Sequence, residues 1–178
     1  MFLGHFAVAY GAKRLAPRIS LGTLFAAAQL PDILWPWLLI AGVEQATIVP
    51  GDTAVTPLRF DSYPVSHSLV TVAAWGALFG ALHFWRRRRV RDAVLLVLLT
   101  VSHWLLDFVS HRADMPLWPG GPRLGLELWR SVPLTVLVEL LLACETVLHS
   151  QNIILLSLEL CLSRPQGSLV AHELHFGV

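Results

Sequence analysis

The chain has 178 residues, of which 55% are hydrophobic and only 14% are charged. Soluble domains are about 45–50% apolar and about 25% charged, so this composition argues against a soluble domain and indicates an integral membrane protein. The net charge is +1, and the arginines concentrate between two apolar segments, which is typical of a membrane flank and does not indicate nucleic-acid binding. The two cysteines are too few for a disulfide-stabilised secreted domain.

The N-terminal segment is predicted to be a helix that is too short to cross a bilayer. A transmembrane helix needs roughly 20 residues, whereas residues 2–15 form a shorter, mildly apolar stretch. This stretch can form a partial span if it pairs with residues 20–40 in a helical hairpin that turns at Pro17. At a rise of 1.5 Å per residue, His5 and Asp32 then lie at similar depth, roughly 18–22 Å above the turn.

Four apolar segments of spanning length follow, at residues 21–42, 67–85, 93–110 and 132–149. Glycine, proline and polar residues fill the connections 43–66 and 111–131, where we expect loops. The predicted fold is all-α: a multi-pass transmembrane helical bundle of about four spans with a short N-terminal partial-span helix, in a single domain over residues 1–149. We expect residues 150–178 to be a divergent, poorly ordered C-terminal tail, because the apolar run 153–162 is too short to span.

The arginines and lysine near the segment ends predict the orientation of the chain. Basic residues are enriched in short cytoplasmic loops, and they concentrate in residues 13–18 and 86–92. We therefore expect these two regions in the cytoplasm and the connections 43–66 and 111–131 on the outer side. The second of these connections carries three arginines, but alternation of the spans places it opposite the arginine-rich turn.

Polar residues with metal-ligand chemistry recur within the third span. His103, Asp107 and His111 are spaced i, i+4 and i+8, so all three project from one helical face. Imidazole and carboxylate groups are ligands for zinc, manganese or iron. In the alternative interpretation, His103 bonds a neighbouring helix, Asp107 bonds His103, and His111 lies in interfacial water. Ionisable groups inside a span cost about 2.5–3.5 kcal/mol, which favours a metal or proton site.

Three further residues are expected near the same level in the outer half of the bilayer. Asp32 follows Pro31, which predicts either a functional carboxylate or a simple helix kink at that point. His67 either contributes to the site or only starts a helix with Ser66 as its N-cap. Glu139 has no neutralising neighbour in sequence, so we expect it to find a partner on another helix.

The connection after the third span could bind an anionic group. Arg112 and Arg130, with Asp114 between them, are the candidate substrate-binding residues, because arginine holds phosphate through paired hydrogen bonds. The alternative is that these arginines contact lipid head groups.

Several short motifs recur in the same order as in a known family: Gly4-His5, Leu30-Pro31-Asp32, Ser66-His67-Ser68, residues 102–114 and Trp129-Arg130-Ser131 with Glu139. In this order and spacing, residues 1 to about 142 resemble the YdjM-like inner-membrane proteins, described as membrane-bound metal-dependent hydrolases. The resemblance implies a multi-pass protein of the inner (plasma) membrane. It implies a polar site at His5, Asp32, His67, His103, Asp107 and His111, with Asp114 and Glu139 as additions.

The first functional hypothesis is a metal-dependent hydrolase whose site opens to the outer face and acts on a lipid-linked or phosphoester substrate. Its cofactor would be a divalent metal ion, zinc before manganese, held by His67, His103 and Asp107. Asp32 or Glu139 is the candidate catalytic base. The remaining histidines of the motif, His5 and His111, would bind a second ion or orient the ligands.

The second hypothesis is a non-enzymatic membrane protein, either a proton or ion pathway or a partner-binding protein, whose buried His, Asp and Glu residues join its helices. A conducting pathway needs polar residues through the whole depth of the membrane. Residues 72–82 and 94–99 are almost wholly apolar. This pattern favours a one-sided pocket over a pathway, and leaves catalysis and a structural metal as alternatives.

Overall fold

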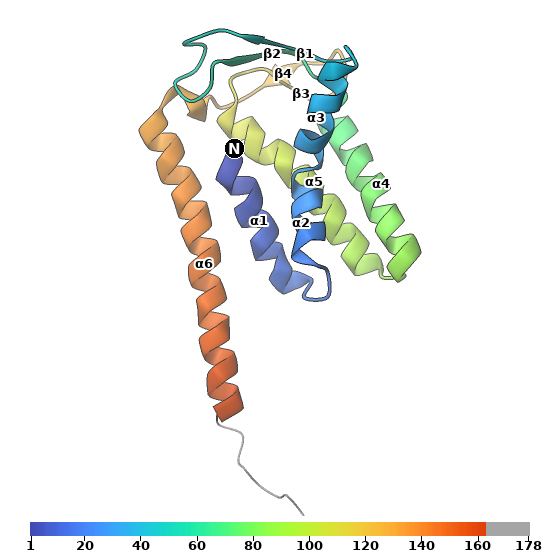
Figure 1. Ribbon diagram of the computed structural model, residues 1–178, viewed down its shortest axis with the longest axis vertical. Coiled ribbons are helices and arrows are strands. Elements are labelled where there is room, and N and C mark those ends of the chain that lie inside the picture. Colours follow the sequence, from blue (N-terminus) through green and yellow to red (C-terminus); the bar gives the residue numbers. More distant parts are fainter. Residues whose placement is uncertain (163–178) are drawn as a thin grey trace, which may run out of the picture.

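The computed structural model describes residues 1–162, with side chains through residue 146 and at residue 148. The described part of the chain is mostly helical (Figure 1). Its helices are α1 (Phe2–Leu15), α2 (Leu21–Ala28), α3 (Leu30–Ile40), α4 (Leu69–Arg87), α5 (Val90–Ser110), the 3₁₀ turn η1 (Leu128–Arg130) and α6 (Val132–Leu162). Residues 163–178 of the expected tail lie outside the described residues.

The predicted helical hairpin at the N-terminus is confirmed. α1 covers residues 2–15 and packs against α2, which runs back along it after a short turn (Figure 1). Pro17 follows the end of α1, where its ring cannot continue the helix. Ser20 begins α2 as its N-cap, since its hydroxyl accepts a hydrogen bond from the Thr23 N–H at 3.1 Å. The turn carries His5 and Asp32 to the same end of the molecule.

The segment 21–42 is broken at Gln29, where α2 and α3 meet at a bend of 54°. We predicted a kink at Pro31, and the bend lies two residues earlier, at Gln29. Pro31 lies in the first turn of α3, where its missing N–H costs nothing. Near the break, the Ala27 carbonyl oxygen accepts the Thr100 hydroxyl of α5 at 2.9 Å.

The second and third expected spans are α4 and α5. Among the described residues, these two helices are long and apolar enough to cross a membrane, and the bent pair α2–α3 becomes a third if it counts as one span. α6 begins where the fourth span was expected and continues to Leu162, beyond the expected end at residue 149.

α4 and α5 form the closest helix pair in the molecule. Only Arg88 and Arg89 connect them, and Arg88 has a left-handed φ of 54°. Gly80 lets the backbones approach, because a Cβ at this position would lie 2.8 Å from the Ala93 carbonyl oxygen. Small residues at such crossings are typical of membrane helices.

The all-α prediction was wrong at the two long connections, which contain short antiparallel hairpins. β1 (Gln45–Ile48) pairs with β2 (Leu58–Ser62), and β3 (Met115–Pro116) pairs with β4 (Arg123–Leu124). Both hairpins lie at the same end of the molecule (Figure 1). The Ala54 N–H donates to the Trp129 carbonyl oxygen at 3.0 Å, which links the two connections. The two loops predicted on one side therefore do lie together, opposite the arginine-rich turn.

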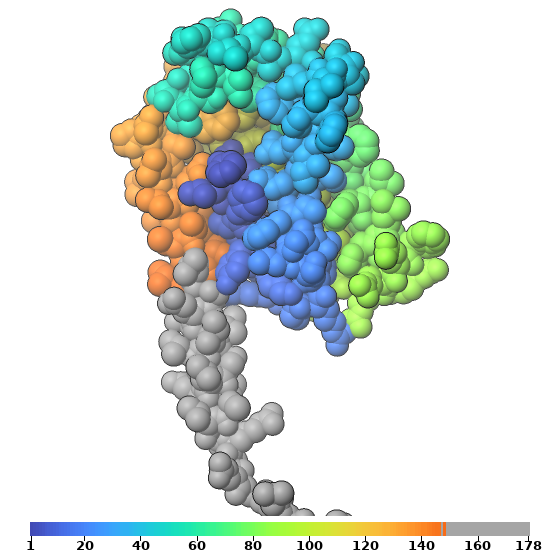
Figure 2. Space-filling model, viewed as in Figure 1, coloured from blue at the N-terminus to red at the C-terminus, as the bar shows by residue number. Residues whose placement is uncertain are grey.

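The helices bury one apolar core and leave large apolar side chains outside. The core comprises Ala9, Ala16, Ile19, Leu24, Ala27, Ala28, Leu96 and Leu99. The outward faces of α4 and α5 carry Leu78, Leu82, Leu98 and Leu105, each more than half exposed. In Figure 2 the first residues of the chain are visible between α6 and α2. The His/Asp residues described next lie where these elements meet the hairpins.

Candidate metal centre

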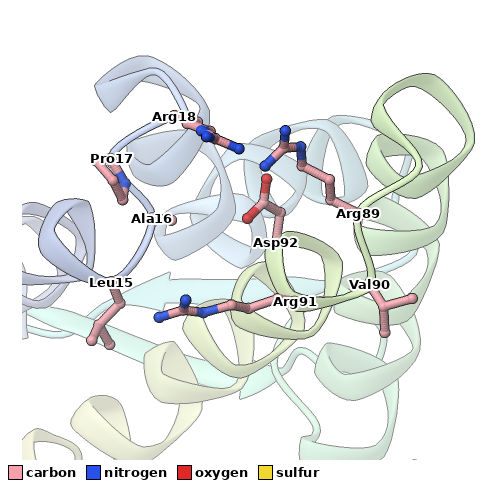
Figure 3. A pocket seen from close by; sticks show the side chains of 8 residues that line it. All are labelled: Leu15, Ala16, Pro17, Arg18, Arg89, Val90, Arg91 and Asp92. Carbon is pink, nitrogen blue, oxygen red and sulfur yellow. The ribbon is translucent and has the colours of Figure 1, made fainter.

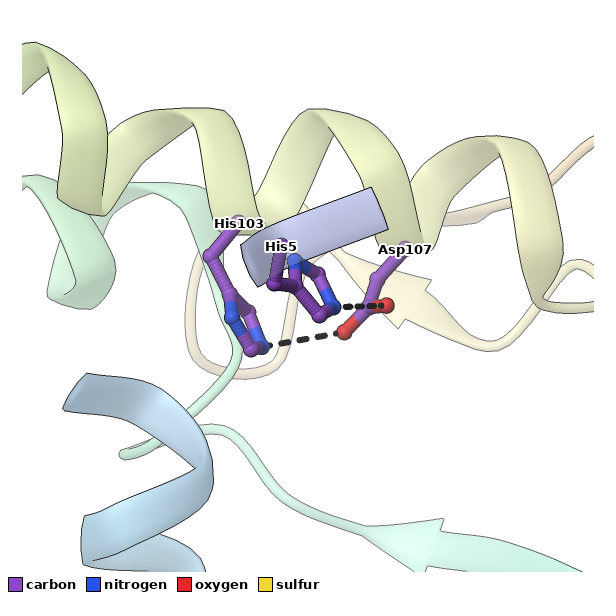
Figure 4. Close-up of side chains that lie close together, drawn as sticks. All are labelled: His5, His103 and Asp107. Carbon is purple, nitrogen blue, oxygen red and sulfur yellow. Dashed lines mark hydrogen bonds and ion pairs between the residues drawn. The ribbon is translucent and has the colours of Figure 1, made fainter. Parts of the chain in front are cut away.

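Five polar residues from distant parts of the sequence meet near the hairpin end of the molecule. They are His5 on α1, Asp32 on α3, His67 just before α4, and His103 and Asp107 on α5. Two overlapping sets could hold a metal ion, His5 with His103 and Asp107, and Asp32 with His67 and His103. Their ligand atoms lie within 4.8 Å of one another. Figure 4 shows the first set, in which both histidines turn toward the carboxylate. The predicted convergence is confirmed for these five residues.

His103 is fully buried and has only one of its ring nitrogens in a hydrogen bond. Its Nδ1 donates to the Ala28 carbonyl oxygen at 2.7 Å, and a carbonyl can only accept. In the neutral ring, Nε2 is therefore the bare nitrogen. It lies 3.1 Å from Asp107 Oδ2 and 3.6 Å from Asp32 Oδ1. The angles between His103 Nε2 and Asp107 are not those of a hydrogen bond, so the buried Nε2 has no hydrogen-bond partner. The dashed line between the two residues in Figure 4 marks the ion pair that a protonated ring would form.

His67 is oriented in the same manner by a chain of side chains. Glu44 is buried, and its Oε2 accepts the Ser66 hydroxyl at 2.6 Å. The Ser66 oxygen then accepts from His67 Nδ1, also at 2.6 Å. The remaining His67 Nε2 lies 3.3 Å from Asp32 Oδ1 and 3.9 Å from Asp107 Oδ2. Glu44 and the role of Ser66 were missed from sequence. The true N-cap of α4 is Ser68, which corrects the assignment of Ser66.

His5 and the amino group of Met1 contact the other oxygen of Asp107. His5 Nε2 is 3.1 Å from Asp107 Oδ1, and its ring stacks on His103 with centroids 3.9 Å apart. The Met1 ammonium donates to the same carboxylate oxygen. A cation is therefore already favoured at this edge of the cluster.

These residues pass a simple test of fit for a divalent cation. When both rings are neutral, two imidazole lone pairs and two carboxylate oxygens face one another, and a positive charge among them stabilises this arrangement. Asp107 Oδ2 lies 3.1 Å from His103 Nε2 and 3.9 Å from His67 Nε2, on either side of the roughly 3.3–3.4 Å expected between tetrahedral ligands of an ion about 2.0–2.1 Å away. Histidine and carboxylate are also the ligand types of catalytic zinc sites.

A cavity of about 120 Å³ borders the cluster. His5, Asp32, His67 and Asp107 form its polar wall, and aromatic side chains, among them Trp35, Phe60 and Trp129, form the rest. The Asp32 side chain is 44% exposed, whereas that of Asp107 is 5% exposed. Asp32 is thus the carboxylate of the cluster that a ligand can reach.

His111 lines the same cavity but belongs to neither ligand set. Its Nδ1 lies 3.2 Å from Asp114 Oδ1, which also accepts the Tyr63 hydroxyl at 2.8 Å. Burial alone would raise the pKa of the Asp114 carboxyl, but hydrogen bonds from His111, Tyr63 and Arg112 outweigh it and hold the pKa below its ordinary value. Burial, reinforced by the charge of Asp114, raises the pKa of the Tyr63 phenol. Asp114 therefore acts as a charged support for His111.

The candidate base Glu139 lies away from the cluster. Its two carboxylate oxygens accept the backbone N–H groups of Phe2 and Leu3 at 3.0 and 2.8 Å. These N–H groups begin α1 and have no partner within the helix. Glu139 has the expected partner on another helix, and that partner is the start of α1.

The arginines proposed to bind substrate are engaged elsewhere. Arg112 donates to Asp52 at 2.8 Å and to Asp114 at 3.0 Å. Arg130 is exposed and pairs with Glu127 at 2.8 Å. Neither arginine lines the cavity at the cluster, so the structure does not bring them to the site.

Comparisons with protein-family models, with curated proteins and with solved structures found no match.

Proposed function

We propose that the protein is a metal-dependent hydrolase of the inner membrane, with about four spans formed by α2–α3, α4, α5 and α6. One observation carries the proposal: with neutral rings, His67 and His103 each donate Nδ1–H to a protein acceptor and direct the other ring nitrogen, Nε2, toward Asp32 and Asp107. Two imidazole nitrogens directed at two carboxylates favour a bound cation. The resemblance to the YdjM-like proteins agrees with this assignment.

His67, His103 and Asp107 would hold the ion, with zinc preferred over manganese because two imidazoles and one carboxylate suit it. When bound, a divalent ion lowers the pKa of water toward about 7 and polarises a carbonyl or phosphoryl oxygen. Asp32, the exposed carboxylate of the cluster, is placed to accept a proton from the attacking water. Glu44 and Ser66 fix the ring of His67, and Ala28 fixes that of His103.

The walls of the cavity favour an amphiphilic substrate. Trp35, Phe60 and Trp129 lie beside the polar cluster, so an apolar portion can pack on aromatic rings while an ester or phosphoester reaches Asp32. A lipid-linked or phosphoester compound from the outer leaflet meets this description. The outward leucines of α4 and α5 support contact between these helices and lipid.

The second candidate is a non-enzymatic role in which the same groups join helices or carry a proton. It is favoured by the bonds from His103 to Ala28 and from Met1 to Asp107, which link α5 to α2 and α1. A proton on either Nε2 would relieve the same repulsion that a metal ion relieves. Measured metal content separates the two functions.

Elemental analysis of the detergent-purified protein tests the proposal. The test variant combines His103→Ala with Asp107→Ala. The matched control combines His83→Ala on α4 with Asp92→Ala on α5, which removes the same side-chain types at the end of the molecule away from the cluster. We expect about one equivalent or more of zinc or manganese in the native protein and the control, and its loss in the test variant. Size-exclusion profiles establish that each variant is folded.

Absence of metal from the native protein after reloading would overturn the hydrolase and favour the helix-joining role. Retention of metal in the test variant would place the ion elsewhere. If metal follows the expected pattern, a screen of phospholipid and phosphoester substrates with Asp32→Asn as the inactive comparison tests catalysis. Hydrolysis that Asp32→Asn leaves intact would exclude Asp32 as the base.

A further inference from the structure

A large cavity lies at the end of the molecule opposite the His/Asp cluster. Its volume is about 560 Å³, and two turns form its walls, residues 15–18 after α1 and residues 89–92 at the start of α5 (Figure 3). This volume falls within the range of about 300–1,000 Å³ typical of small-molecule sites. The cavity is far from the proposed hydrolytic centre and has no role in it.

Positive charge dominates these walls. Arg18 and Arg89 extend toward Asp92, and Arg91 extends toward Leu15 (Figure 3). Three positive charges and one negative charge on the walls leave a net +2. Among residues 1–146, no ion pair engages any of the three arginines. Guanidinium groups bind phosphate oxygens through paired, charge-assisted hydrogen bonds. A phosphate-bearing anion is therefore the ligand class that complements the cavity.

Both turns hold their arginines on a fixed backbone. The connection between α4 and α5 has two residues, and Arg88 completes it in the left-handed conformation. In the other turn, the Lys13 ammonium donates to the carbonyl oxygens of Pro17 and Ile19 at 2.9 and 2.6 Å. The backbone that carries the arginines is thus set before a ligand arrives, which reduces the entropy cost of binding.

Apolar side chains beside the arginines indicate an amphiphile. Leu15 and Val90 line the cavity and are 58% and 65% exposed. The cavity also lies at the end of α4 and α5, which are long enough to cross a bilayer. In that setting the phosphates of one leaflet lie at the level of the arginines. We propose that this cavity binds the phosphate of an anionic phospholipid head group, at a site separate from the metal centre.

Titration of the delipidated protein in detergent with dioctanoyl phosphatidylglycerol tests this site. The test variant is Arg89→Gln with Arg91→Gln, and the control is Arg86→Gln with Arg88→Gln, which removes the same charge from the same turn outside this cavity. We expect affinity to fall at least about 10-fold in the test variant, as two charge-assisted contacts are lost, and less than about 2-fold in the control. Arg18→Gln should weaken binding from the opposite turn.

Two further arms identify the source of the phosphate. Failure of inorganic phosphate to compete supports a lipid ligand, whereas competition at similar affinity supports a free phosphate compound and overturns the lipid assignment. An equal loss of affinity in both double variants would overturn the proposed site, because it would show that the lipid is attracted only to a basic surface. Native binding no tighter than that of dioctanoyl phosphatidylcholine also overturns it. Metal content is measured on the same samples, so that a failure of the lipid site is distinguished from a failure of the proposed metal centre.

Discussion

Glu44 lies buried against Ser66 and accepts its hydroxyl hydrogen at 2.6 Å, although the two residues are separated by both strands of the first hairpin. The backbone N–H groups of Val65 and Ser66 donate to the other Glu44 oxygen, each at 2.8 Å. The carboxylate therefore holds the segment that carries His67. The candidate metal centre therefore depends on Glu44, a residue outside both sets of candidate ligands.

Ser66→Ala should weaken metal binding without removing a ligand. The change leaves His67 Nδ1 and Glu44 without their shared partner, so the ring loses its fixed orientation. Loss of an outer-shell partner typically lowers metal affinity 10- to 100-fold, which competition with a chelator measures. Ser110→Ala is the control, because that buried hydroxyl bonds the Leu106 carbonyl within α5. Equal affinities in the two variants would contradict a positioning role for Ser66.

Glu139→Gln should lower stability and leave metal binding unchanged. A glutamine amide presents only one acceptor oxygen, so one of the N–H groups of Phe2 and Leu3 loses its partner. The expected cost is about 1–2 kcal/mol, as for the loss of a helix cap or a charge-assisted bond. Thermal unfolding in one detergent measures it against Glu145→Gln on the same helix, an exposed site. Loss of hydrolysis at unchanged stability would instead restore Glu139 as a catalytic base.

Gly80→Ala should separate α4 from α5. The added methyl group would lie 2.8 Å from the Ala93 carbonyl oxygen and 2.9 Å from Val97 Cγ2, and such overpacking costs about 1–3 kcal/mol. Gly22→Ala is the control, since no atom lies within 4 Å of its added Cβ. We expect a lower midpoint of thermal unfolding for the first variant and an unchanged or higher one for the second. An unchanged midpoint for Gly80→Ala would show that the helices cross farther apart.

Tyr63→Phe should destabilise the protein in a pH-dependent way. The lost bond to the ionised Asp114 is worth about 1.5–3 kcal/mol. Because the folded-state pKa of Asp114 is lowered, its contribution is present above the unfolded pKa of about 3.9 and disappears as pH falls through the folded value. Unfolding midpoints of native protein and variant should differ at pH 7 and converge below about pH 4. A difference that persists in acid would assign the effect to packing.

Helix positions and the convergence of polar residues could be read from the sequence. Counting the rise per residue from Pro17 places His5 and Asp32 at one level, and the spacing of His103 and Asp107 places them on one face. Both inferences depend on regular geometry, which local sequence specifies well. For this reason the helix over residues 2–15 and the gathering of the cluster agree with the structure.

The partners that complete the site could not be predicted from the sequence. Glu44 reaches Ser66 through a hairpin, and the strands of that hairpin are too short to show a clear alternation of apolar residues. Glu139 binds backbone N–H groups, which every residue carries, so no side-chain pattern identifies its target. The sequence offered Arg112 as a phosphate ligand, but its guanidinium donates to Asp52. That contact depends on the packing of two loops, which no local pattern predicts.

The break at Gln29 has a consequence for the biogenesis of the protein. In an unbroken helix the carbonyl of Ala28 would bond the N–H four residues later, and His103 would have no acceptor. The interruption leaves that oxygen for α5, which is synthesised some sixty residues later by the count from Gln29 to Val90. The Ala28 carbonyl can hold the ring of His103 with its proton on Nδ1 only after α5 has inserted beside α2, so the proposed metal site is completed late in biogenesis.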